Sequence, residues 1–103
     1  MSRTVILQPR AEEDILNALD HFRDPLVASR WFSRIMAHMD RLSDSAEWYG
    51  LADESDELGV ELRETFFGNK SSRCRIVYQI VGEVVRIITV RRGSRDRFTA
   101  DDL

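Results

Sequence analysis

The apolar positions of this chain follow two spacings, one typical of strands and one typical of helices. Residues 4–7 are β-branched or apolar, which predicts a short strand. Two apolar stripes at helical spacing come next: Ala11, Ile15, Ala18, Leu19 and Phe22, then Ala28, Trp31, Ile35, Met39 and Leu42. These stripes predict two helices in an antiparallel hairpin, whose apolar sides must cover a further apolar layer such as a sheet.

Two prolines predict where these helices begin. Pro9 suits the first position of a helix because proline has no N–H to lose there. Pro25 follows Asp24, whose side chain can cap a helix N-terminus. The residue before a proline is also pushed out of the α region, so the first helix should end near Arg23.

The C-terminal half predicts three strands, at residues 60–67, 73–81 and 84–92. Gly82 and Glu83 separate the last two with glycine first, as a type II′ hairpin prefers. The expected order is therefore strand, helix, helix and three strands. It describes an α+β fold in which a helix hairpin packs on a sheet.

Residues 43–59 show no clear period and are predicted to connect the helices to the next strand. A connection of this length is uncommon in a small domain and is often functional. We expect Trp48 and Tyr49 to anchor it on the body of the domain. The alternative is that these two side chains are exposed for a partner.

The chain has 103 residues and a mass of 12.0 kDa, which predicts one domain over residues 1–103. Its 43% hydrophobic and 32% charged residues are typical of a soluble globular protein. It holds no apolar run long enough for a membrane span, and its first residues do not resemble a secretory leader. We therefore expect a cytoplasmic protein that does not bind a membrane.

Few residues suggest metal or nucleophile chemistry. Cys74 is the only cysteine, and with His21 and His38 it gives too few ligands of the usual spacing for a zinc site. We expect Cys74 to be an inert packing residue and both histidines to be partly buried or capping side chains. The sequence has no glycine-rich phosphate loop and no nucleophile elbow, so no cofactor and no small-molecule substrate are expected.

Charge is distributed unevenly, although the net charge is only −3. Acidic residues exceed basic ones over residues 1–60, and the reverse holds over residues 61–98. Of the 15 basic residues only Lys70 is a lysine, and arginine favours planar, two-point contacts to carboxylates or phosphates. Such asymmetry predicts an anionic partner for the basic half, unless its arginines merely cover the solvent side of a sheet.

The arginines of the last two strands form the most specific candidate site. With Val81 opposite Val84, the hairpin places Arg75 opposite Val90 and Arg73 opposite Arg92. Like charges that face each other are destabilising unless an anion joins them. One sheet edge should then present about four guanidinium groups, from Arg73, Arg75, Arg91 and Arg92, to nucleic acid or to an acidic protein segment. The alternative is neutralisation by the chain's own acids, in the 43–59 connection or at Asp96, Asp101 and Asp102.

Four segments resemble the RelE/ParE toxins of bacterial type II toxin–antitoxin systems, also called plasmid stabilisation proteins. Residues 9–15 are similar to the start of that family's first helix, and residues 50–64 to the stretch that leads into its second strand. Residues 75–80 and 90–96 are similar to its last two strands. The resemblance implies a two-layer β-α-α-β-β-β fold with an antiparallel four-stranded sheet, in which the first strand pairs with the last.

The resemblance also implies two possible activities. RelE-like members cleave mRNA on the ribosome without a metal, whereas ParE-like members bind DNA gyrase. Arg75 and Arg95 match arginines of the nuclease pattern. The aromatic position is Phe98, which cannot transfer a proton, and residues 60–67 offer Arg63 but no lysine. The sequence thus favours a ParE-like inhibitor of growth over an enzyme. A degenerate, non-toxic member that keeps only antitoxin binding is the third possibility, because the sequence pI of about 5.3 is low for such toxins.

The resemblance and the arginine pattern together predict two protein-binding sites. We expect the C-terminal segment to bind the cellular target through Arg91, Arg92, Arg95, Arg97 and Phe98. We expect carboxylates of a cognate antitoxin to pair with Arg73, Arg75, Arg86 and Arg92.

Overall fold

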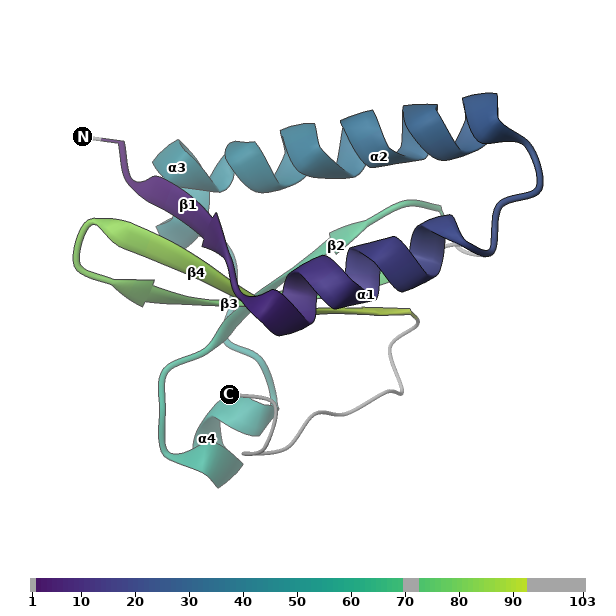
Figure 1. Ribbon diagram of the computed structural model, residues 1–103. Helices are drawn as coiled ribbons and strands as arrows, with labels where there is room; N and C mark the ends of the chain where they lie inside the picture. Colours follow the sequence, from purple (N-terminus) through teal and green to yellow (C-terminus); the bar gives the residue numbers. More distant parts are fainter. Residues whose placement is uncertain (1, 70–72, 93–103) are drawn as a thin grey trace.

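The computed structural model describes residues 2–69 and 73–92. Over this part the chain forms a strand, two long helices, a connection with short helices, and three further strands (Figure 1). The elements are β1 (Thr4–Leu7), α1 (Pro9–Leu19), α2 (Pro25–Asp40), α3 (Leu42–Ser45), the 3-10 helix η1 (Ala46–Trp48), α4 (Glu54–Leu58), β2 (Arg63–Phe67), β3 (Cys74–Val81) and β4 (Val84–Arg92). No helix in the described ranges is both long and apolar enough to cross a membrane.

The strands form one sheet in the order β1-β4-β3-β2, and the helix hairpin covers one of its faces (Figure 1). This confirms the predicted α+β fold and the pairing of the first strand with the last. The pairs β2–β3 and β3–β4 are antiparallel, as expected, whereas β1 lies parallel to β4. A parallel pair needs a long crossover connection, and the chain between β1 and β4 provides one.

Both faces of the sheet are covered, by layers of different size. On the hairpin side, Ile15 of α1 and Ile35 and Met39 of α2 pack against Tyr78 and Ile87 of the sheet. On the opposite side, where Figure 1 shows α4, a smaller cluster is formed by Ala52, Leu62, Val77 and Ile88. The segment predicted as an irregular connection therefore holds three short helical elements, and α4 forms a partial third layer.

Local signals set the start of each long helix. Pro9 and Pro25 occupy the first helical turns, and the Asp24 carboxylate accepts a hydrogen bond from the N–H of Leu26 at 2.9 Å. Helix α1 ends at Leu19, four residues before the predicted end near Arg23.

The hairpin of β3 and β4 begins in the predicted register and then departs from it. Val81 faces Val84 and Tyr78 faces Ile87, but a β-bulge leaves Ile88 without a partner. The predicted pairing of Arg75 with Val90 is therefore wrong, because one extra residue on β4 shifts every later pair. Arg75 faces Arg91, and Cys74 faces Arg92.

Helix α1 closes the edge of the sheet that β1 leaves open. β1 pairs with β4 only as far as Ile87, so the last part of β4 lies at an edge. There the Asp14 carboxylate accepts hydrogen bonds from the N–H of Val90 at 3.0 Å and from the hydroxyl of Thr89 at 2.7 Å. One side chain of α1 thus replaces the missing strand and fixes the helix against β4.

We predict that His38 makes the fold sensitive to mild acid. Its Nε2 lies 3.0 Å from the Thr65 hydroxyl, which joins α2 to β2. Burial, with a smaller contribution from Arg41, lowers the pKa of His38 below its ordinary value of 6.5. At His38 the unfolded chain therefore binds a proton more readily than the folded chain. The contribution of neutral His38 to the free energy of unfolding is complete above pH 6.5 and declines as the pH falls.

Urea unfolding at pH 7.5 and pH 5.5 measures this effect. The His38→Gln variant should lose less stability than the wild type on acidification, and the control variant His21→Gln should lose as much as the wild type. An equal loss for His38→Gln and the wild type would contradict the assignment.

Candidate protein-binding site

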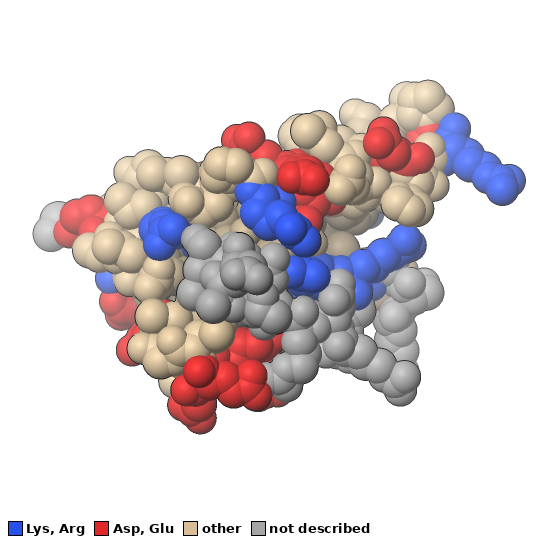
Figure 2. Space-filling model, turned by 60° about the horizontal axis from the view of Figure 1, so that its bottom comes forward, with Lys and Arg blue, Asp and Glu red and all other residues tan. Residues whose placement is uncertain are grey.

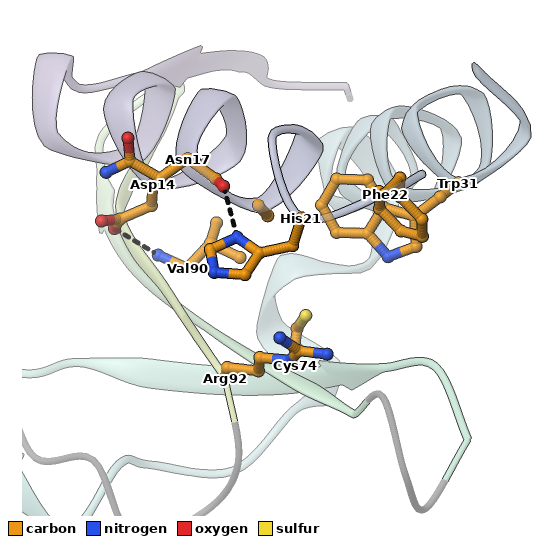
Figure 3. A pocket seen from close by; sticks show the side chains of 9 residues that line it. Asp14, Asn17, His21, Phe22, Trp31, Cys74, Val90 and Arg92 are labelled. Carbon is orange, nitrogen blue, oxygen red and sulfur yellow. Dashed lines mark hydrogen bonds between the residues drawn. The ribbon is translucent and has the colours of Figure 1, made fainter. Parts of the chain in front are cut away.

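A cavity of about 340 Å³ lies between α1 and the end of the sheet where β3 begins and β4 ends. Figure 3 shows the ring of Phe22 beside that of Trp31 at one end of the cavity, with Asp14 and Asn17 toward the other. Its lining residues are Asp14, Asn17, Ala18, His21, Phe22, Trp31, Cys74, Val90 and Arg92. The cavity exists because β1 ends early and leaves space beneath the second half of α1.

A second cavity, of about 480 Å³, shares Phe22 and Trp31 with the first. We call the two together the hairpin groove. The additional lining residues of the second cavity are Val27, Arg30, Arg34, Phe67, Gly68 and Asn69. The ring centres of Phe22 and Trp31 are 5.5 Å apart, and those of Trp31 and Phe67 are 6.5 Å apart. Three aromatic rings thus line the middle of the groove.

The charged residues of the hairpin groove are mostly basic. Arg30, Arg34 and Arg92 line it, and among the described residues Asp14 is the one acidic residue in the lining. The Asp14 carboxylate is already engaged by Thr89 and Val90. An apolar groove with arginines along it suits a protein segment that carries large apolar side chains flanked by carboxylates.

His21 and Cys74, which line the first cavity, act as a capping and a packing side chain, as the sequence predicted. The Nδ1 atom of His21 lies 2.8 Å from the carbonyl oxygen of Asn17 (Figure 3). This hydrogen bond gives a partner to a carbonyl near the end of α1. Cys74 is buried, and desolvation raises the pKa of its thiol while nearby Arg92 lowers it less strongly. A thiol with a raised pKa is a poor nucleophile.

Arg75 is not on the surface. Its guanidinium binds Glu54 of α4 through two hydrogen bonds, of 2.9 and 2.6 Å, and Glu64 of β2 through one of 3.2 Å. Arg75 is 5% exposed and Glu54 is 1% exposed. The hydrogen bonds to Glu54 raise the pKa of Arg75 further, against the effect of burial. Two carboxylates of the chain thus neutralise this arginine, as the alternative interpretation of the basic cluster expected.

The structure brings only part of the predicted arginine cluster together: Arg75 faces Arg91 on the neighbouring strand, but its guanidinium is buried against two carboxylates. The Arg73 guanidinium lies 4.0 Å from the ring centre of Phe66, and Arg91 donates to the Thr89 hydroxyl. Arg86 donates to the side chains of Gln79 and Gln8. Arg92 alone of the expected antitoxin-binding residues lines the hairpin groove. Arg95, Arg97 and Phe98 lie outside the described residues.

Figure 2 shows one side of the molecule, on which basic side chains lie across the middle of the view and acidic side chains lie above and below them.

Trp48 corrects a second expectation. It is 82% exposed, so it does not anchor the connection on the body of the domain. Tyr49 packs against the core on the hairpin side and provides that anchor instead. The alternation of the sequence gave no signal for this difference, because both rings stand in a segment without a period.

The helix hairpin and the sheet order agree with the fold of the small toxins that the sequence resembles. The sequence model of the family described as ParE toxin of type II toxin-antitoxin system, parDE, matches residues 5–97, and the chain belongs to this family. Membership implies a cognate antitoxin as partner. A search of curated proteins found no match.

We predict that Glu54 is a major determinant of stability. In a Glu54→Ala variant the buried Arg75 loses its two-point partner, which should lower the free energy of unfolding by about 3 kcal/mol. The matched control is Glu61→Ala, which removes an exposed partner of Arg63 and should cost less than about 1 kcal/mol. Urea denaturation measures both variants, and similar small losses would show that the buried pair is not important for stability.

Proposed function

We propose that this toxin arrests growth by binding DNA gyrase and that its cognate antitoxin neutralises it by occupying the hairpin groove. The observation that carries the proposal is the groove itself, an apolar surface with arginines that suits a protein ligand. The same proposal implies that the chain acts in the cytoplasm, where gyrase acts. It also implies a role in plasmid stabilisation, which toxins of this type are named for.

Protein binding is favoured over RNA cleavage by the state of Arg75. Metal-independent cleavage needs free cations for the phosphorane charge and groups that transfer protons. Glu54 and Glu64 already occupy the guanidinium of Arg75, which matches an arginine of the nuclease pattern. Arg63 donates to the backbone carbonyls of Glu47 and Tyr49 instead of facing open solvent. Neither arginine is presented to a phosphate.

The antitoxin is proposed to bind as a segment that is disordered until it docks. Such segments bury large apolar side chains and pair their charges at the rim. The rings of Phe22, Trp31 and Phe67 would receive the apolar side chains, and Arg92 would pair with a carboxylate. Target binding through Arg91, Arg92, Arg95, Arg97 and Phe98 remains part of the proposal.

Induction of the toxin in a bacterial culture distinguishes the candidate targets. We expect growth arrest with induction of the DNA damage response, and inhibition of supercoiling when the purified toxin is added to gyrase. Co-expression of the antitoxin encoded beside the toxin should restore growth. Codon-dependent mRNA cuts with unaffected supercoiling would instead establish the ribosome-dependent nuclease, and a folded chain that leaves growth unchanged would establish the degenerate member.

We predict that antitoxin affinity depends on arginines in the hairpin groove. Arg92→Glu combined with Arg34→Glu should weaken binding at least tenfold, about 1.4 kcal/mol, because two groove cations become anions facing carboxylates. Arg86→Glu is the matched control, because this arginine bonds to Gln79 and Gln8 outside the groove. Titration calorimetry at two salt concentrations gives the affinities. A loss for Arg86→Glu as large as for the groove variant would move the antitoxin site elsewhere.

A further inference from the structure

We propose that Trp48 and Leu51 form a docking surface for the toxin's cellular target, separate from the hairpin groove. The matching surface on the target is an apolar pocket with lysines or arginines at its rim. This inference rests on the proposed function, because it assumes that the chain acts by binding a protein.

The exposure of Trp48 is the first observation. Trp48 is 82% exposed, whereas tryptophan side chains in folded domains are mostly buried. Leu51, three residues further on, is 54% exposed. Tryptophan is among the residues most enriched at the energetic centres of protein interfaces. We call these two side chains, which the described part of the chain leaves largely uncovered, the patch.

The backbone on both sides of Trp48 is fixed. Before it, the Tyr78 hydroxyl donates to the carbonyl of Ala46 at 2.6 Å. After it, Arg63 donates to the carbonyl of Tyr49 at 2.6 Å, and Gly50 accepts from the N–H of Glu64 at 3.1 Å. A side chain on a backbone that is already ordered loses little conformational entropy when a partner binds. The structure therefore presents Trp48 in a fixed position.

The charges beside this patch indicate the character of the partner. Glu47, next to Trp48 in the chain, pairs with Arg3. Glu61 pairs with Arg63, which also donates a hydrogen bond to the carbonyl of Tyr49. In both pairs the carboxylate is the exposed member, with side chains 64% and 68% exposed for the glutamates and 22% for each arginine. The surface around Trp48 is therefore negative where a partner would meet it, and a cationic rim is its complement.

The patch lies away from the groove along the sheet. Leu51 pairs with Arg63, which faces Tyr78 on β3, and the Tyr78 hydroxyl donates to the carbonyl of Ala46 just before Trp48. The groove includes Cys74, which lies four residues earlier on β3, about 13 Å of extended chain. A segment bound in the groove thus need not cover Trp48.

The test compares Trp48→Ala with Leu16→Ala, which removes another exposed apolar side chain on α1. Each variant is assayed for growth arrest, for affinity to purified gyrase and for affinity to the cognate antitoxin. Both substituted side chains are exposed, so both variants should fold, and circular dichroism checks this. We expect Trp48→Ala to abolish arrest and weaken gyrase binding by about tenfold or more, with antitoxin affinity unchanged and Leu16→Ala equal to the wild type.

Each other outcome has a definite meaning. Undiminished arrest by Trp48→Ala overturns the docking surface, and so does a loss of antitoxin affinity without a loss of arrest. A shift of the wild type from dimer to monomer on Trp48→Ala, seen by sedimentation, would assign the patch to a second copy and overturn it too. If the wild type arrests growth but does not bind gyrase, only the target is wrong, and the arrest assay still decides the docking surface. If the wild type does not arrest growth, both proposals fail.

Discussion

The buried ion pair of Arg75 with Glu54 determines how the second half of this chain is arranged. A guanidinium on an apolar face of the sheet would be costly without a partner, and Glu54 of α4 supplies one. The bond holds α4 against the sheet, where Leu62 and Ala52 then cover Val77 and Ile88. The segment with Trp48 precedes α4 and is fixed by its own contacts, because Tyr78 donates to the carbonyl of Ala46 and Arg63 to that of Tyr49. The ion pair also removes Arg75 from the set of cations open to a nucleic acid.

The two faces of the sheet therefore serve different purposes. On the hairpin side, a short β1 and the Asp14 carboxylate leave a groove under α1 without breaking the sheet edge. On the opposite side, the ion pair holds α4 over the sheet and keeps Arg75 buried. The chain belongs to the ParE toxin family, and the groove is the surface on which the proposed protein binding rests.

Much of the fold could be predicted because its signals are local. Pro9, Pro25 and Asp24 mark helix starts by their own backbone preferences, and Gly82 marks the turn that sets the hairpin. The bulge at Ile88 could not be predicted, because Ile87, Ile88 and Thr89 are all buried and no alternation shows which residue is extra. Only the packing of both sheet faces selects it.

The candidate site was harder to predict because its decisive contacts join distant segments. Glu54 stands in an acidic run, and nothing local distinguishes it from its exposed neighbours Asp56 and Glu57. The sequence indicates that this acidic segment can neutralise nearby arginines. Which of its carboxylates pairs with Arg75 depends on tertiary structure. The hairpin groove combines residues from α1, α2 and the strand ends, of which the sequence indicated only Arg92 as a binding residue.

The central claim is that Arg75 has a structural role and that the toxin acts by binding a protein. Its most direct test replaces both members of the buried pair, as Arg75→Met with Glu54→Leu, so that only Glu64 loses a partner, and its carboxylate is partly exposed. Growth arrest is then measured on induction, after circular dichroism has shown that the variant is folded. The account predicts arrest as strong as that of the wild type. A folded double variant that no longer arrests growth would contradict it and return Arg75 to a direct role in toxicity.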